Sequence, residues 1–233
     1  MNAAPEDIRA GLARVREGIA EAARKAGRDP GEVTLVGITK THPAESVAVA
    51  FEQGLKDMGE NRVQEAAGKI PLLPPGIRWH LVGSLQTNKA RQAAGLFELI
   101  QSLDRTRLAS ALNRAAGEAG KPCHALIQVN ATRDPGQGGV PPDEARNLIE
   151  ICLALPYLRI DGLMVIGPYP AGDDEIRRVY RGVRELFERL APLAGPGFRT
   201  LSFGMSGDYR IAVEEGSTLV RVGTAIFGGR MVT

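Results

Sequence analysis

The feature that most constrains this fold is an alternation of short apolar runs with amphipathic stretches, repeated eight times along the chain. The runs that we expect to be strands are residues 33–39, 57–59, 78–82, 97–101, 124–130, 160–166, 200–203 and 219–222. The stretches between them show helical periodicity, as in residues 44–53 and 176–190. Strands that alternate with helices indicate βαβ crossovers and a parallel sheet. Eight such units predict one closed (β/α)8 barrel, a TIM barrel, with a doubly wound sheet as the alternative because the second run is short.

The N-terminal stretch predicts an extra helix that precedes the eight units. Its apolar residues recur at spacings of four and three, at Ile8, Leu12, Val15, Ile19 and Ala22. The least regular stretch, residues 131–142, contains three glycines and three prolines and predicts a mobile loop after the fifth strand. Helical periodicity resumes directly after this loop, so we expect residues 1–233 to form a single domain.

Composition argues against several classes of protein. The formal net charge is +2 over 233 residues, so no charge excess points to nucleic acid or to an anionic membrane as a partner. The chain has no apolar run near the ~18 residues of a spanning helix, and its first residues lack the pattern of a signal peptide. Cys123 and Cys152 form no CxxC pair, and the three histidines lack metal-ligand spacing. We therefore expect a soluble, cytoplasmic protein with no metal site and with both cysteines in its core.

Lysine is scarce, which makes the position of each one informative: only six of the 29 basic residues are lysines. Five of them fall in helical stretches or directly before a strand, namely Lys25, Lys56, Lys69, Lys89 and Lys121. Lys40 instead follows the first strand, at the barrel end where functional sites lie, with the same parity as Val36 and Ile38. Partial dehydration at the barrel mouth favours a neutral amine, which is a nucleophile toward carbonyl groups. A strand-end lysine that extends to solvent is the alternative.

Two glycine-containing loops follow the seventh and eighth strands, where barrels of this kind commonly bind phosphate. Gly204, Ser206 and Gly207 come after the seventh strand, and Ser206 is predicted to cap the helix that follows. Gly223 and Thr224 come after the eighth strand. Glycine lets backbone N–H groups approach an anion, and a helix N-terminus favours negative charge. The loops therefore predict a phosphate site, with glycines that only serve tight turns as the alternative.

Arg221 is a charged residue inside the otherwise apolar eighth strand. A buried guanidinium needs an acceptor, which is either an acidic side chain or a ligand atom. An amine, a phosphate cradle and a partner for a ring nitrogen are the groups that together hold pyridoxal phosphate. The residues thus allow this cofactor at Lys40, and they also allow a phosphate-ligand enzyme in which Lys40 is an aldolase-type base.

Six sequence stretches carry a resemblance to a known family: LVGITKTHP, MGENRVQE, WHLVGSLQTNKAR, GLMVIGP, LSFGMSGD and GSTLVRVGTAIFG. Together they resemble the small pyridoxal phosphate homeostasis proteins, over nearly the whole chain. The resemblance implies a barrel like the N-terminal domain of alanine racemase, without the C-terminal β domain of the racemases.

The resemblance also implies a set of cofactor-binding residues. The matching positions are Lys40 for an internal aldimine with pyridoxal 5′-phosphate (PLP), Arg221 beside the pyridine nitrogen, Ser206, Gly223 and Thr224 for the phosphate, and Asn61 and Met205 for the pocket lining. His80, near the end of the third strand, either faces the pocket or is structural. Gln137 stands where the family commonly has a lysine, which puts in doubt any role for a basic residue there.

Arg221 also bears on the choice between a carrier and an enzyme. A pyridine nitrogen that faces a permanent cation stays unprotonated, which makes the ring a weaker electron sink. Racemases with this arrangement use a base on each face of the substrate carbon, and the tyrosines in plausible loops for a second base are Tyr169 and Tyr209. We therefore expect a non-catalytic, monomeric PLP carrier in vitamin B6 and amino-acid homeostasis, with PLP-dependent apo-enzymes as partners. A PLP-dependent amino-acid racemase is the alternative.

Overall fold

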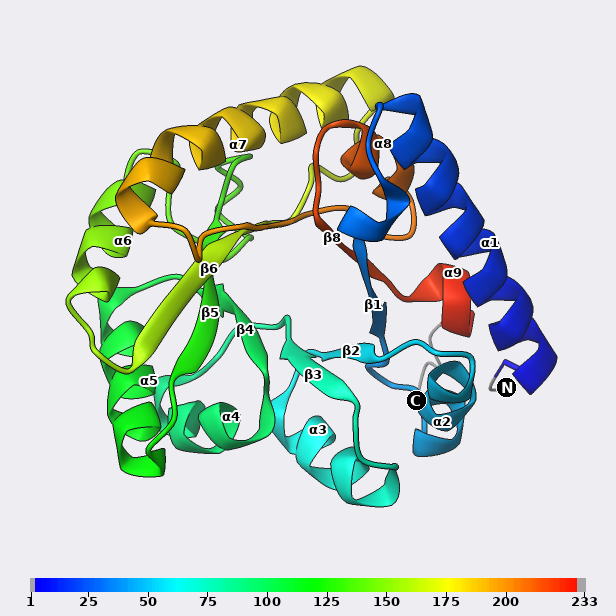
Figure 1. The fold of residues 1–233 in the computed structure, drawn as a ribbon, viewed down its shortest axis with the longest axis horizontal. Coiled ribbons are helices and arrows are strands. Elements are labelled where there is room, and N and C mark those ends of the chain that lie inside the picture. The colour runs from blue at the N-terminus through cyan, green and yellow to red at the C-terminus, as the bar shows by residue number, and fades with distance from the viewer. Residues whose placement is uncertain (1–2, 230–233) are drawn as a thin grey trace.

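Eight parallel strands form a closed barrel in the computed structural model, which describes residues 3–229 (Figure 1). Each strand pairs with the next, and β8 (Leu219–Val222) closes the ring against β1 (Thr34–Ile38). The predicted (β/α)8 barrel is confirmed, and its closure excludes the doubly wound sheet. The single domain over residues 1–233 stays a prediction, and its ends, residues 1–2 and 230–233, lie outside the described part of the chain.

Helices alternate with the strands and surround the barrel in Figure 1. The other strands are β2 (Asp57–Glu60), β3 (Arg78–Leu81), β4 (Leu99–Leu103), β5 (Cys123–Val129), β6 (Leu158–Val165) and β7 (Thr200–Ser202). The helices are α1 (Pro5–Lys25), α2 (Ala44–Glu52), α3 (Val63–Lys69), α4 (Ala90–Leu96), α5 (Thr106–Ala119), α6 (Ala145–Leu153), α7 (Asp173–Ala194), α8 (Tyr209–Glu214) and α9 (Thr224–Phe227). Short 3-10 turns cover Pro30–Glu32, Ile70–Leu72 and Thr87–Lys89.

Every predicted run overlaps a strand, but β4 lies two residues further along the chain than expected. The N–H of Phe97 bonds to the carbonyl of Ala93 and ends α4, so the strand begins only at Leu99. The shift moves Gln101 from the predicted end of the strand to its middle, where its side chain is fully buried. A polar amide therefore lies inside the barrel, where it needs hydrogen-bond partners.

Two apolar layers stabilise the barrel. The larger one lies between strands and helices, and the smaller one fills the barrel with Val36, Ile38, Leu99, Leu126, Met164 and Leu219. Alternate residues of a strand face the same side, so Arg221 shares the interior face with Leu219, and Lys40 continues the face of Ile38. Both cations are thus carried toward the C-terminal mouth of the barrel.

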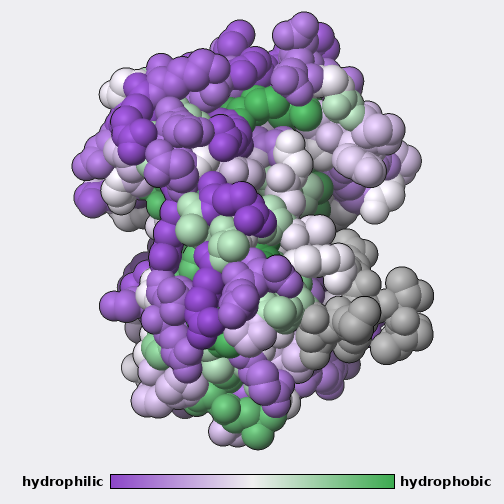
Figure 2. Space-filling model, turned by 90° about the vertical axis from the view of Figure 1, so that its right-hand side faces the viewer, coloured by the Kyte–Doolittle hydropathy of each residue, from purple (hydrophilic) through white to green (hydrophobic). Residues whose placement is uncertain are grey.

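The extra helix α1 covers the part of the barrel where the following helices are short. It packs against α2, α8 and α9, and the last two have only six and four residues. Gly11 allows the close crossing with α9, because a Cβ there would lie 2.7 Å from the Ala225 carbonyl oxygen. The outward face of α1 is polar, and Figure 2 shows a mostly hydrophilic surface on this side of the molecule. The amphipathic helix predicted from the sequence is therefore confirmed.

Both cysteines are free and buried, as predicted. Burial raises the pKa of the Cys123 and Cys152 thiols to about 12. Across residues 3–229, no helix is long and apolar enough to cross a membrane. The same residues contain no cluster of three or more histidine, cysteine, aspartate or glutamate side chains that could hold a metal ion.

Candidate functional site

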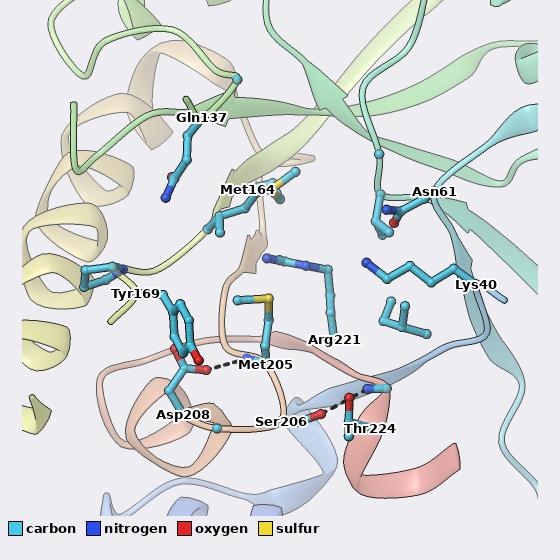
Figure 3. A pocket seen from close by; sticks show the side chains of 18 of the residues that line it. Lys40, Asn61, Gln137, Met164, Tyr169, Met205, Ser206, Asp208, Arg221 and Thr224 are labelled. Atoms are coloured by element: carbon cyan, nitrogen blue, oxygen red, sulfur yellow. Dashed lines mark hydrogen bonds between the residues drawn. The ribbon is translucent and has the colours of Figure 1, made fainter. Parts of the chain in front are cut away.

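A cavity of about 790 Å³ opens at the C-terminal ends of the barrel strands (Figure 3). It is lined by all seven residues that the sequence predicts to bind a cofactor: Lys40, Asn61, Met205, Ser206, Arg221, Gly223 and Thr224. These residues follow or end β1, β2, β7 and β8, which closure of the barrel brings together. Apolar side chains, among them Met164 and Ile166, complete the lining. The structure thus assembles one site from positions spread over most of the chain.

Lys40 lies two residues beyond β1 and extends into the cavity (Figure 3). The backbone turns sharply at the next residue, Thr41, whose φ is +66°. A left-handed conformation is costly for a β-branched residue, about 1–3 kcal/mol, and persists only where neighbouring groups hold it. The turn that presents Lys40 therefore needs support from the surrounding structure.

That support comes from Lys69, at the C-terminal end of α3. Its ammonium donates to the Thr39 carbonyl at 2.7 Å, to Glu60 Oε1 at 2.6 Å and to Glu65 Oε1 at 2.7 Å. Glu65 Oε1 also accepts the N–H of Thr41 at 2.6 Å. The backbone on both sides of Lys40 is therefore tied to one buried cation and its two carboxylates.

Glu60 is fully buried beneath this turn. Burial raises the pKa of its carboxyl group, against the opposing hydrogen bonds from Lys69 and Thr39. Its second oxygen, Oε2, has no hydrogen-bond partner among residues 3–229. An unpaired buried charge is unfavourable, so Lys69 is the group that stabilises the buried carboxylate of Glu60.

Arg221 forms the floor of the cavity from β8 and is almost fully buried. Its guanidinium donates to Ser202 Oγ at 2.5 Å and to the Val165 carbonyl at 2.9 Å, so both acceptors are neutral. Burial lowers the pKa of Arg221 to about 10, against the nearby Tyr180 and Asp208, and the side chain still carries its charge at neutral pH. The two acceptor types left open by the sequence were an acidic side chain and a ligand. No carboxylate within residues 3–229 is hydrogen-bonded to this guanidinium, which leaves its charge for a ligand acceptor.

Ser206 joins the two glycine-containing loops. Its hydroxyl oxygen accepts the N–H groups of Gly223 and Ala225, each at 3.3 Å, and Figure 3 shows the first of these bonds. The predicted role of Ser206 as cap of the following helix is wrong, because α8 begins only at Tyr209 with Asp208 in the cap position. The serine instead marks a place where two backbone N–H groups and hydroxyl groups converge. Such a donor set suits an anion.

Asp208 fixes the shape of the loop that carries Met205 and Ser206. Its Oδ1 accepts the N–H of Met205 at 2.6 Å, and its Oδ2 accepts the buried hydroxyl of Tyr180 at 2.5 Å. The carboxylate thus anchors the loop after β7 to helix α7, and Asp208 itself lines the cavity (Figure 3).

Other residues singled out in the sequence lie in different surroundings. His80 is not among the cavity-lining residues; it bonds to Asp57 and Gln101 inside the barrel, so the structural interpretation holds. Tyr169 and Gln137 line the cavity, with Tyr169 91% exposed at its rim. Tyr209 begins α8 and does not line it.

Sequence reasoning missed His42 and Lys69. His42 is buried in the cavity wall two residues after Lys40, and burial and the Lys69 charge lower its pKa, opposed by Glu65. The signal that could have predicted His42 as a cavity residue is its position only two residues after Lys40 in the sequence. For Lys69 the signal was the spacing of four residues from Glu65, which predicts an ion pair on one helix face.

Residues 11–231 match the family described as "Alanine racemase, N-terminal domain". A pyridoxal phosphate homeostasis protein from Aquifex aeolicus is 40% identical over 220 residues, covering 94% of this chain and 96% of the relative. The protein of the same name from Escherichia coli strain K12 is 40% identical over 230 residues, covering 96% and 97%. This chain belongs to the pyridoxal phosphate homeostasis protein family.

A solved structure of PipY from Synechococcus elongatus agrees with the barrel of this family member. Its TM-score is 0.83 at 36% identity, and the match covers 95% of this chain and 100% of PipY. That PipY structure contains bound PLP. The resemblance seen in the sequence is therefore confirmed at the level of family and fold.

Proposed function

We propose that this protein is a carrier of pyridoxal 5′-phosphate that holds the cofactor in the barrel cavity and serves vitamin B6 and amino-acid homeostasis without robust catalysis. The observation that carries the proposal is that three groups line one cavity: the amine of Lys40, the cation of Arg221 and the donors around Ser206. The names of the relatives and the PLP-bound PipY structure support it.

The residues of the cavity fit this cofactor. Around Ser206, two backbone N–H groups already converge on an oxygen atom, the kind of atom that a phosphate presents. Gly223 keeps the cradle open to the barrel, since a Cβ there would lie 3.3 Å from both the Cβ and the carbonyl oxygen of Ile38. Arg221 offers a charge with only neutral protein acceptors, which suits an aromatic nitrogen lone pair.

Lys40 has the role of covalent anchor in this proposal. Its primary amine condenses with the aldehyde of the cofactor, releases water and holds the cofactor as an internal aldimine. Lys69 and Glu65 keep the turn at Thr41 in place, so the amine is presented toward the cavity in a fixed direction. Asn61 and Met205 line the same cavity and complete the contacts to the cofactor.

Arg221 and the exposed position of Tyr169 together favour a carrier over an enzyme. Bound PLP supplies electron-withdrawing chemistry, which is strong only when the ring nitrogen is protonated. A permanent cation against that nitrogen disfavours its protonation and so weakens the ring as an electron sink. Tyr169 is 91% exposed at the rim and is therefore poorly placed to act as a second, oriented base.

The second candidate function is that of a PLP-dependent amino-acid racemase. One observation favours it: His42 lines the cavity close to Lys40, and its lowered pKa keeps the imidazole neutral and able to accept a proton. The two functions differ in whether an amino acid is turned over, and both require the same cofactor anchor.

The test is a visible absorption spectrum of the purified protein with added PLP, followed by borohydride reduction and peptide mapping. We expect a visible imine band and a reduced adduct at Lys40, and loss of both in Lys40→Ala. Lys56→Ala is the matched control, because Lys56 is exposed before β2 at the opposite end of the barrel, and it should bind like the wild type. An adduct at another lysine contradicts the assignment of the anchor. Absence of any imine band contradicts the PLP proposal and favours an aldolase-type use of Lys40.

A second assay separates carrier from racemase. Sustained Lys40-dependent racemisation of alanine or another amino acid overturns the carrier in favour of the racemase. Transfer of PLP from the loaded protein to a PLP-dependent apo-enzyme is expected for a carrier, and sedimentation should show a monomer. Absence of transfer contradicts the role in delivery and leaves storage of the cofactor as the function.

A further inference from the structure

A line of hydrogen-bonded polar side chains crosses the barrel interior beneath the cavity. Arg221 donates from Nη1 to Ser202 Oγ at 2.5 Å, and Ser202 Oγ donates to Gln101 Oε1 at 2.7 Å. Gln101 Nε2 lies 3.1 Å from Nδ1 of His80, whose Nε2 lies 3.0 Å from Asp57 Oδ1. All five side chains are buried. The line thus runs from the cavity floor across β7, β4 and β3 to β2.

The two ends of this line fix the direction of every hydrogen bond in it. Arg221 has only donors, so Ser202 must accept from it. At the other end, burial opposes ionisation of Asp57, but hydrogen bonds from His80 and Arg78 outweigh it and lower the pKa of Asp57 to about 2. Arg78 holds this carboxylate with two hydrogen bonds, at 2.7 and 2.5 Å. Asp57 is therefore an acceptor only, and Nε2 of His80 carries a proton toward it.

The middle of the line then has one consistent arrangement. With Nε2 protonated, a neutral His80 accepts the amide N–H of Gln101 at Nδ1, which turns the amide oxygen toward Ser202. A doubly protonated His80 would require the amide to flip, and its NH2 group would then face Ser202 together with the Arg221 donor. The Ser202 hydroxyl would lose its acceptor, and a buried unsatisfied donor is unfavourable.

We propose that Ser202, Gln101 and His80 are positioning residues that hold Arg221 toward the ligand as a cation with only neutral hydrogen-bond acceptors, with His80 kept as the neutral Nε2–H tautomer. The line supplies Arg221 with a neutral oxygen acceptor in place of a carboxylate, so the charge of the guanidinium is available to a ring nitrogen. This part of the inference rests on the proposed PLP site, whereas the tautomer of His80 is a property of the ligand-free chain.

The first experiment measures the tautomer directly, by NMR of the 15N-histidine-labelled, ligand-free protein at neutral pH. The chain has three histidines, and His80→Asn identifies the signal of interest. We expect one protonated and one unprotonated ring nitrogen at His80, with Nε2 protonated. A doubly protonated ring, or a proton on Nδ1, overturns the proposal whether or not the protein binds PLP.

Gln101→Glu is the discriminating variant in the same measurement. Its carboxylate oxygens can only accept, so one takes the Ser202 proton and the other requires a proton on Nδ1 of His80. We therefore expect both ring nitrogens of His80 to be protonated in this variant. An unchanged neutral His80 beside an ionised carboxylate at position 101, identified by its 13C chemical shift in the folded Gln101→Glu protein, shows that Gln101 does not set the tautomer and overturns the proposal.

The second experiment measures PLP affinity in Ser202→Ala. Removing an acceptor of a charged donor typically costs about tenfold or more in an equilibrium constant, so we expect PLP binding at least ~10-fold weaker, with Lys40 still trapped by borohydride. The matched control is Ser217→Ala, which removes another fully buried serine hydroxyl, bonded to backbone carbonyls outside the line. Equal affinities for Ser202→Ala and Ser217→Ala overturn the positioning role. If the wild type binds no PLP, the proposed function fails. The NMR experiment on the ligand-free protein still decides whether His80 is the neutral Nε2–H tautomer.

Discussion

Replacing Lys69 by methionine is the perturbation that best tests how the turn at Lys40 is held. The variant keeps the length and apolar stem of the side chain but removes the ammonium that pairs with Glu60 and Glu65. The Lys69 and Glu60 side chains are 11% and 0% exposed, so this is a buried ion pair. Leaving one partner of a buried pair uncompensated costs about 3–5 kcal/mol. We expect Lys69→Met to lower the free energy of unfolding by at least ~3 kcal/mol.

The same variant makes a prediction about pH. Burial already raises the pKa of Glu60 in the folded protein, and loss of Lys69 raises it further. A carboxyl group whose pKa is higher when folded binds more protons in the folded state, so its contribution to stability is lost as the pH rises through the folded pKa. The stability deficit of Lys69→Met should therefore shrink when the pH is lowered from ~7 to ~5.

Denaturant titrations of the wild type, Lys69→Met and Arg146→Met at several pH values measure both effects. Arg146 is the matched control, because it pairs with Glu150 at the same spacing of four residues but on an exposed helix surface. Exposed pairs of this kind contribute about 0.3–0.5 kcal/mol. A Lys69→Met protein as stable as the Arg146→Met control, or a deficit that does not change with pH, would refute the role assigned to this buried pair.

Three further predictions concern the core and the loops of the barrel. Cys123 and Cys152 should react with a thiol reagent at neutral pH only after unfolding, since burial raises both pKa values to about 12, and fast labelling of the native protein would contradict this. Gly11→Ala should lower the free energy of unfolding by about 1–3 kcal/mol, measured by denaturant titration, because its Cβ would lie 2.7 Å from a carbonyl oxygen of α9. Tyr180→Phe should lower the free energy of unfolding by about 1–3 kcal/mol, measured by denaturant titration, because it leaves a buried oxygen of Asp208 without its hydrogen-bond donor.

The barrel was predictable because its signal is repeated and local. Eight apolar runs separated by helical stretches leave few topologies, and errors of one or two residues at each boundary do not change the order of the strands. The position of Lys40 followed from the same logic, since the end of a strong strand and its parity are both readable from a few neighbouring residues. Arg221 was predictable for the same reason.

The partners of these cations were not predictable, because they lie far away in the sequence. Ser202 and Gln101 are 101 residues apart along the chain, and they meet only because closure of the barrel brings side chains of the non-neighbouring strands β7 and β4 together in its interior. Parity tells which side of a strand a residue occupies, but not which residue of a non-neighbouring strand it will contact. The two-residue displacement of β4 was enough to hide Gln101, which the predicted boundary placed at a strand end.

Lys69 shows a different limit of reasoning from pattern. Lys69 falls in a helical stretch away from the strand ends, so the position rule for barrels gives it no role in the site. A lysine on an exposed helix face is normally solvated, and the spacing of Lys69 from Glu65 fits such a face. Helix α3 has only seven residues, however, and its last residue reaches back over the end of β1 to the Thr39 carbonyl. In a barrel with helices this short, the C-terminal end of a helix lies close enough to the neighbouring strand-end loop to contribute to the site. Charged residues in such short helices can therefore contribute to a barrel site as residues at strand ends do. In this chain Lys69 does so, because it binds the backbone next to Lys40.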